Sequence, residues 1–271
     1  MKRIRKRDAP PQELVDYIRK NPVTSEAHTW ESFRDNCQSG LKAVQKALYE
    51  DQRGLCAYCE LELVPKFDFR VSHFHPKRAA GLEGDHSWEL RWDNMHGACN
   101  GGTSNVYQHP ERRVENNVEA DKHCDVVIGN EILDDKILNP LKIPPFPRLF
   151  QYEEISTAVG ESELRIEVDA TSCAAARYLG EQGCMKRAQD TIDIMHLNSA
   201  NLMKMRESTY EEIKKRINQR VNSGDDLGTA MKRVAEVAFS ERETWPEFFT
   251  VWRWALRDKA EEVLRSVNYD G

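Results

Sequence analysis

The sequence predicts an α+β protein that is predominantly helical, with a small metal-binding unit set among the helices. Apolar residues recur at helical spacing through the first fifty residues and through most of the chain after residue 172. Between about 55 and 105 the pattern changes to short strands, turns and clustered Cys, His and Asn. Pairs of soft metal ligands enclose this strand-rich segment, which is typical of a small metal-stabilised unit.

The composition indicates a cytoplasmic protein with no membrane partner. The chain has 271 residues, enough for one large domain or two modest ones. No apolar run approaches the ~20 residues needed to cross a bilayer. The basic N-terminus also lacks the apolar segment of a secretory signal. The seven cysteines are therefore expected to be metal ligands and core thiols rather than disulfides.

The formal net charge of −6 argues at first against a nucleic-acid partner. A globally acidic protein can still bind phosphate through a local basic patch, because such contacts are short-ranged and screened. Lys77 and Arg78 form a patch of this kind within the strand-rich segment. The net charge therefore excludes no nucleic-acid function.

Local patterns place each helix and hairpin. Phe67, Phe69 and Val71 alternate, which is typical of a strand with one buried face. The proline-rich stretch 137–147 cannot be helical and is a predicted connector. In chain order the predicted elements are helices at 11–20 and 28–51, a hairpin from 62–65 and 68–73, a second hairpin at 155–168, and helices at 199–221, 226–239 and 245–265.

A domain boundary is predicted near residue 150. Residues 1–150 then hold the N-terminal helices and the metal-binding core at about 55–105, and residues 151–271 form a mostly helical region. The last predicted helix carries an apolar stripe that includes Phe249 and Trp252, as expected of a helix that faces a core.

Two pairs of potential zinc ligands stand out, Cys56-Ala-Tyr-Cys59 and His96-Gly-Ala-Cys99. Two intervening residues allow a tight turn to place both side chains on one tetrahedral zinc. The alternative is that the cysteines are buried small hydrophobes and His96 is incidental. Four protein ligands would fill the coordination sphere, so the predicted site is structural rather than catalytic. The triplet His123-Cys124-Asp125 is expected in a surface loop.

The motifs between and after these pairs carry a family resemblance. S-H-F-H-P-K at 72–77, R-W-D-N at 91–94 and C-N at 99–100 follow C-A-Y-C-E at 56–60. This order resembles the HNH, or ββα-metal, nuclease family. More narrowly, it is similar to the PtuB-like HNH proteins of Septu and retron-associated anti-phage systems. The likeness spans most of the chain, although only the nuclease core has specific motifs.

The resemblance implies a role for each matching residue. His73 matches the general base that takes a proton from the attacking water, and an ordinary imidazole, with a pKa near ~6.5, suits that task. Asn94 matches the position that braces the hairpin and orients the base. Asn100 matches the position whose side-chain oxygen ligates a divalent ion. That ion, Mg²⁺ or Mn²⁺, would stabilise the leaving oxygen of the scissile phosphate.

Ser72 departs from the family pattern, in which an acidic metal ligand precedes the base. His75 is a candidate replacement, because side chains two apart on a strand share a face. A phosphate contact is the competing interpretation of His75. Asp93 and Asp125 are alternative ligands. If no group replaces the carboxylate, the resemblance implies a weakened or inactive nuclease.

The function implied by the resemblance is that of a metal-dependent endonuclease that hydrolyses phosphodiester bonds in nucleic acid, with DNA favoured. It would act as the effector of an anti-phage system with a PtuA-like ATPase subunit and, through that complex, with retron RNA or DNA. The helical region at 151–271 is expected to dock the ATPase. Two alternatives remain, a nuclease that cleaves RNA such as tRNA, and a non-catalytic zinc-binding module, which Ser72 leaves open.

Overall fold

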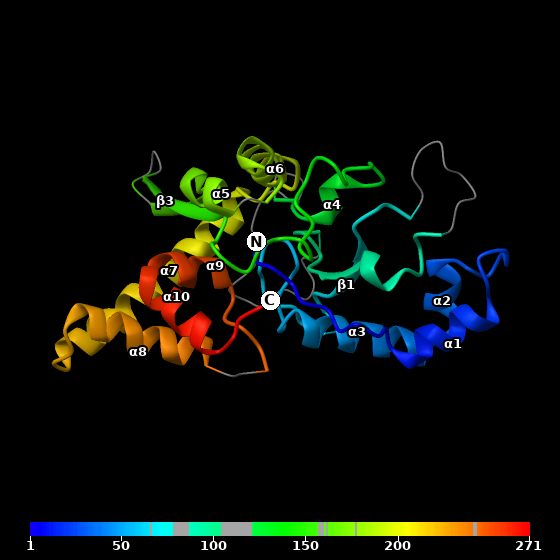
Figure 1. The fold of residues 1–271 in the computed structure, drawn as a ribbon, viewed down its shortest axis with the longest axis horizontal. Coiled ribbons are helices and arrows are strands. Elements are labelled where there is room, and N and C mark those ends of the chain that lie inside the picture. Colours follow the sequence, from blue (N-terminus) through cyan, green and yellow to red (C-terminus); the bar gives the residue numbers. More distant parts are fainter. Residues whose placement is uncertain are drawn as a thin grey trace.

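The computed structural model describes residues 1–65, 67–77, 87–103, 121–156, 160, 162–176, 178–240 and 243–271. The molecule is elongated, with the N-terminal helices at one end, the C-terminal helices at the other and both termini near the middle (Figure 1). Two antiparallel two-stranded sheets lie among the helices of the described part. The predicted α+β class, predominantly helical, is confirmed. Among the described residues, none of the helices has the length and apolar character needed to cross a membrane.

The described part of the chain contains helices and two pairs of strands. They are α1 (Gln12–Lys20), α2 (Trp30–Asn36), α3 (Gln38–Asp51), β1 (Arg70–His73), the 3-10 helix η1 (Trp92–Asn94), β2 (Met95–Ala98), α4 (Asp125–Ile128), β3 (Phe150–Ser156), β4 (Ser162–Val168), α5 (Ala170–Ala176), α6 (Glu181–Ile194), α7 (Ala200–Asn222), α8 (Leu227–Phe239), α9 (Phe249–Ala255) and α10 (Arg257–Ser266). The second predicted hairpin is present, but its first strand begins at Phe150, five residues before the predicted start, and Phe150 lies opposite Val168.

Two predicted helices are each divided in two. The segment 28–51 breaks at Cys37, whose φ of −131° and ψ of 67° lie outside the helical region. The segment 245–265 begins later than predicted, at Phe249, and breaks at Arg257, whose φ is 54°. A continuous α-helix cannot contain a residue with positive φ, so the chain turns between α9 and α10.

The strand predicted at 68–73 is present, but its predicted partner is wrong. β1 pairs with β2, with Arg70 opposite Ala98 and His73 opposite Met95. Val64 and Asp68 form only an isolated bridge. Alternation shows which residues share a face of a strand and does not specify the segment that pairs with it.

Two apolar cores position the β1–β2 pair. The smaller packs α1 and α3 against one face, and Leu14, Leu48 and Met95 are among its buried residues. The larger includes the loop from Leu55 to Leu63, the β3–β4 pair and the C-terminal helices. The same core therefore continues across residue 150, where β3 begins.

Glu60 joins the metal-binding loop to the C-terminal helices. Its carboxylate is buried, accepts a hydrogen bond from the backbone N–H of Thr250 at 2.8 Å and also bonds the Thr250 hydroxyl. The carboxylate lies 3.3 Å from the amine of Met1. The backbone carbonyl of Glu60 accepts from the N–H of Phe248. The loop that carries Cys56 and Cys59 is thus tied to the start of α9.

Candidate metal centre and adjoining pocket

Four buried cysteines meet between the loop after α3 and the start of α4. The Sγ atoms of Cys56, Cys59, Cys99 and Cys124, here called the cysteine cluster, all lie within 4.8 Å of one another. The Sγ–Sγ distances are 3.6 Å for Cys59–Cys99, 3.8 Å for Cys99–Cys124 and 3.9 Å for Cys56–Cys124. Tetrahedral Zn–S bonds of about 2.3 Å would separate the sulfurs by about 3.8 Å. The cluster therefore has the donors and the dimensions to hold a metal such as zinc.

Backbone hydrogen bonds shape this cluster. The N–H of Glu60 donates to the carbonyl of Cys56 and closes the C-A-Y-C turn. The N–H of Cys99 donates to Sγ of Cys56 at 3.4 Å, so β2 is fastened to the same turn. Burial alone would raise the pKa of Cys59, but hydrogen bonds from the other three thiols lower it. At Cys59 this environment favours a thiolate, the form that binds metal, whereas burial and the neighbouring thiols raise the pKa of Cys124.

The structure differs from the prediction at the fourth ligand, because His96 lies outside the cluster. His96 belongs to β2, and residues three apart on a strand point to opposite faces. Two ligands separated by two residues can bind the same metal when a tight turn brings their side chains together. Cys56 and Cys59 lie in such a turn, whereas His96 and Cys99 do not. His96 lies opposite Ser72, and neither ring nitrogen has a hydrogen-bond partner among the described residues.

Cys124 takes the place that His96 was expected to occupy. The surface loop expected for its triplet is wrong here, since Cys124 is fully buried. Nε2 of the adjacent His123 lies 3.6 Å from Sγ of Cys99, and Nδ1 bonds the carbonyl of Asp121. The sequence offers one indication that Cys124 is a ligand, because it is the next cysteine after Cys99.

A cavity of about 290 Å³ opens between β1 and α4, beside the cysteine cluster. We call it the β1–α4 pocket. One wall comes from the edge of β1 and the segment after it, and the other from α4 and the turn that follows. Its polar lining consists of Arg70, Ser72, His73, Lys77, Asp125 and Asn130. Since Asp125 directly follows Cys124, the cluster fixes the position of α4 in this wall.

His73 is held in a defined orientation at this pocket. Its Nε2 lies 2.9 Å from the carbonyl of Glu89, and its ring meets Trp30 edge-on at 5.1 Å between centroids. A carbonyl can only accept, so Nε2 carries the proton in this hydrogen bond and Nδ1 carries the lone pair of the neutral ring. Burial lowers the pKa of His73 to about 3. His73 is therefore neutral at pH 7, the form that accepts a proton, but its pKa lies below the value of about 6.5 expected from the sequence, so it is a weaker base than an ordinary imidazole.

Asp125 brings a carboxylate to the position where Ser72 lacks one. Its side chain is 9% exposed, and one carboxylate oxygen lies 3.4 Å from Nε of Arg70. The other oxygen has no hydrogen-bond partner among the described residues. Burial raises the pKa of Asp125, while Arg70 and the hydroxyl of Ser72 oppose that rise. Asp93, the other alternative, is exposed and pairs with Arg91 at 2.6 Å.

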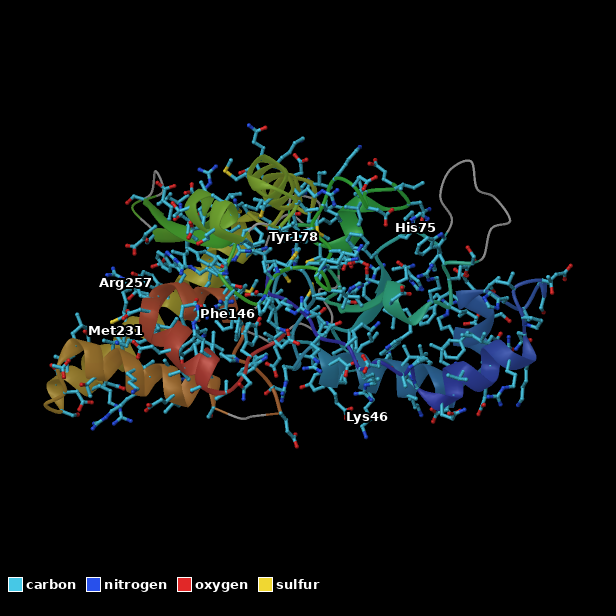
Figure 2. The ribbon with its side chains drawn as sticks, viewed as in Figure 1. Lys46, His75, Phe146, Tyr178, Met231 and Arg257 are labelled. Carbon is cyan, nitrogen blue, oxygen red and sulfur yellow. The ribbon has the colours of Figure 1, made fainter. Side chains whose placement is uncertain are left out.

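Asn94 braces the chain just after β1. Its Oδ1 accepts the N–H of His75 at 2.7 Å, and its Nδ2 donates to the carbonyls of His75 and Trp88 at 3.0 Å. His75 lies beyond the end of β1 (Figure 2), with its ring tilted by 31° against Trp88 at 4.3 Å between centroids and its Nδ1 2.8 Å from a carboxylate oxygen of Asp134. The shared face expected for His75 is wrong, because the strand ends at His73.

Asn100 is not brought to His73. Its Nδ2 donates to the carbonyl of Phe67 at 2.8 Å, at the Ala98 end of β2, whereas His73 lies at the opposite end of the strand pair. Asn130 lines the β1–α4 pocket instead, and no motif in the sequence pointed to it. Lys77 lines the pocket and pairs with Glu31, and Arg78 lies outside the described residues.

Comparisons with known proteins give one sequence relative in support of a nuclease. No family model matches the chain. The chain is 28% identical over 210 residues to "Retron Ec83 putative HNH endonuclease" of Escherichia coli, and the match covers 74% of this chain and 76% of the relative. This similarity supports an HNH nuclease in a retron context.

Proposed function

We propose that this chain is a metal-dependent HNH endonuclease that hydrolyses phosphodiester bonds, preferably in DNA, with the β1–α4 pocket as its active site. One observation carries the proposal: His73 and Asp125 line the same pocket, directly beside the cysteine cluster. The similarity to the retron HNH endonuclease supports the same reaction.

The chemistry is divided among the residues of this pocket. Nδ1 of His73 accepts the proton of the attacking water, and the Glu89 carbonyl keeps the ring in the required orientation. Arg70 and Lys77 contact the phosphate, as guanidinium and ammonium groups do at phosphodiesters. Asp125 would ligate Mg²⁺ or Mn²⁺, which supplies charge to stabilise the leaving oxygen. Zinc held by the cysteine cluster would be structural.

Asp125→Asn is expected to abolish most metal-dependent cleavage, because the amide keeps the shape of the side chain and removes its charge. Labelled DNA and RNA of the same sequence, incubated with Mg²⁺ or Mn²⁺, measure the rate and the preferred substrate. Asp93→Asn is the matched control and should cleave normally. Asp125→Asn protein that cleaves with an unchanged rate and metal requirement would exclude Asp125 as the ligand. Wild-type protein that cleaves neither polymer, alone or with the ATPase, would instead favour the non-catalytic module.

We also propose that the protein is the effector of an anti-phage complex with an ATPase subunit, and that this subunit docks on α7 and α8. The retron context of the relative supports a defence role. Val221, Leu227 and Val237 are exposed on or beside these two helices, and Leu227 is 60% exposed. Exposed apolar side chains are available for burial by a partner, so these two helices are the proposed docking surface.

Leu227→Asp is expected to reduce co-purification of the ATPase by tenfold or more, since a charge in an apolar contact must be desolvated without a partner. Val23→Asp is the matched control, because Val23 is similarly exposed at 56% and belongs to the N-terminal end. Equal recovery of the ATPase with both variants would place the docking surface elsewhere.

A further inference from the structure

The guanidinium of Arg206 is buried next to the larger apolar core. Arg206 belongs to α7 and is 1% exposed. Its Nη1 has no hydrogen-bond partner among the described residues, and none of their carboxylates forms an ion pair with it. A charge is costly to remove from water, so buried charges in proteins are normally paired or bound to a metal. The anionic partner of Arg206 is therefore a group other than a directly bonded carboxylate.

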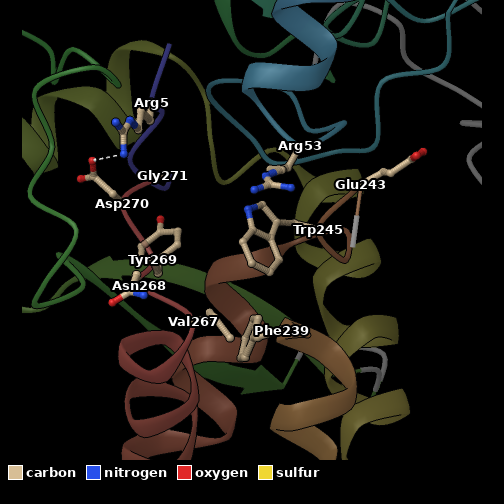
Figure 3. Close-up of a pocket in the computed structure, with 10 residues that line it drawn as sticks. All are labelled: Arg5, Arg53, Phe239, Glu243, Trp245, Val267, Asn268, Tyr269, Asp270 and Gly271. Carbon is tan, nitrogen blue, oxygen red and sulfur yellow. Dashed lines mark ion pairs between the residues drawn. The ribbon is translucent and has the colours of Figure 1, made fainter. Parts of the chain in front are cut away.

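Other arginines of this chain have carboxylate partners. Arg253 is also buried, at 3% exposed, and its guanidinium donates to both oxygens of Glu261 at 2.9 and 2.8 Å. In the cavity between the two ends of the chain, Arg5 pairs with Asp270 at 3.3 Å (Figure 3). The fold therefore provides a carboxylate for one buried arginine and a different environment for the other.

Two aromatic rings and the turn of the cysteine cluster lie next to Arg206. The guanidinium lies 5.9 Å from the ring centroid of Tyr152 and 5.8 Å from that of Phe248. Such rings attract a cation, but they carry no net charge. The backbone N–H of Phe248 donates to the carbonyl of Glu60, and Glu60 directly follows Cys59 in the sequence. Arg206 is therefore placed beside the loop that holds two of the four cysteines.

The carboxylate of Glu60 is engaged by other groups. It accepts a hydrogen bond from the backbone N–H of Thr250 at 2.8 Å and also bonds the Thr250 hydroxyl. It lies 3.3 Å from the amine of Met1, which is its ion-pair partner. Glu60 therefore leaves the charge of Arg206 unbalanced.

The remaining negative charge beside Arg206 belongs to the cysteine cluster. Burial lowers the pKa of Arg206, and negative charge on nearby groups opposes this effect; these groups are Tyr152, Cys59, Glu60 and Cys124. Tyr152 itself stays neutral, because burial raises its pKa. Four thiolates outweigh the charge of one divalent ion, so the cluster is anionic when it holds a metal.

We propose that Arg206 is the counter-charge of the cysteine cluster and that it raises the affinity of this cluster for a divalent metal such as zinc. The guanidinium and the filled cluster attract each other through a buried environment, where the attraction between opposite charges is stronger than in water. Arg206 does not line the β1–α4 pocket, so it is a positioning residue that acts through the metal. The proposal rests on a metal in the cluster and is independent of the nuclease function.

Arg206→Met removes the charge and keeps most of the length of the side chain. Full-length protein loaded with Zn²⁺ is titrated with EDTA, and the metal that stays bound is measured. We expect Arg206→Met to bind Zn²⁺ about 10–100-fold more weakly than the wild type, the usual effect of losing a group that supports metal ligands. Arg206→Gln, a second uncharged variant, should show a similar loss. Arg206→Lys retains the charge and should recover much of the affinity.

The Co²⁺ form separates the loss of a counter-charge from the loss of a ligand. Co²⁺ bound by thiolates in a tetrahedral site absorbs visible light, and the absorption depends on the ligands. The spectrum of Arg206→Met at saturating Co²⁺ should match that of the wild type, because all four cysteines remain. An altered spectrum would show that the substitution disturbs the ligands themselves, and it would overturn the proposal.

Arg253→Met is the matched control, because it also removes a buried arginine; it should lower the melting temperature and leave the affinity for Zn²⁺ unchanged. An equal loss of affinity in this variant would overturn the proposal, since the effect would then follow from stability alone. Folded Arg206→Met or Arg206→Gln protein with wild-type affinity would overturn it as well, as would Arg206→Lys protein that binds no more tightly than Arg206→Met. Wild-type protein that binds neither Zn²⁺ nor Co²⁺ would refute the metal assignment of the cluster, and this proposal with it.

Discussion

Cys124→Ser should release the bound metal and unfold the region around the β1–β2 pair, whereas His96→Phe should retain both metal and fold. A serine hydroxyl is a poor replacement for a thiolate on zinc, and a site with three thiolates remains incomplete. Structural zinc in small peptides contributes an apparent ~10–16 kcal/mol, which is also folding free energy. The loss of one ligand is therefore expected to lower the free energy of unfolding severely.

Elemental analysis of purified protein and thermal unfolding followed by circular dichroism measure the two effects. Cys173→Ser is the matched control, because Cys173 is a fully buried cysteine outside the cysteine cluster. It should lose some stability and keep a full complement of metal. If His96→Phe lost the metal while Cys124→Ser kept it, the ligand set predicted from the sequence would be restored.

His73→Ala is expected to reduce cleavage by about 10²–10⁴-fold while the metal content and the fold stay unchanged, because loss of a general base has an effect of this size. Burial lowers the pKa of His73 to about 3, so the ring is already neutral at pH 7. The loss of cleavage activity would therefore come from the missing proton acceptor and not from a missing positive charge.

Single-turnover cleavage with Mg²⁺ or Mn²⁺ on the preferred polymer measures this effect. His196→Asn is the control, since His196 does not line the β1–α4 pocket and asparagine tolerates its φ of 47°. An unaltered rate in His73→Ala would remove His73 from the mechanism. An equal loss in His196→Asn would show that the assay reports stability rather than catalysis.

The helices and the second hairpin could be predicted because their signals are local. α1, α7 and α8 begin and end within a residue of the predicted bounds. The spacing of apolar residues within one segment shows which side of a helix faces the core, and this spacing can be read without knowing the rest of the fold. The breaks at Cys37 and Arg257 were not predictable in this way, because they depend on where one helix must turn to pack against another part of the chain.

The site could be predicted only where its residues are close in sequence. Cys56 and Cys59 share a turn, and their spacing indicated a metal ligand pair. The carboxylate beside Ser72 comes from Asp125, more than fifty residues later, and only the folded chain brings them together. His96 and Cys99 have the same spacing, but His96 lies in a strand, where two intervening residues do not direct both side chains to one metal.

The cysteine cluster also brings together Cys99 and Cys124, which are separated in the sequence by residues 100–123. The entropy cost of joining two points of a chain grows only with the logarithm of the number of residues between them, so each doubling adds about 0.6 kcal/mol. A metal bound to both cysteines would therefore hold them together at a cost that depends only weakly on their spacing in the sequence. His73 and Asp125 would keep their separation, since the two walls of the pocket would be fastened at the metal. The sequence spacing of these two cysteines would thereby be uncoupled from the geometry of catalysis.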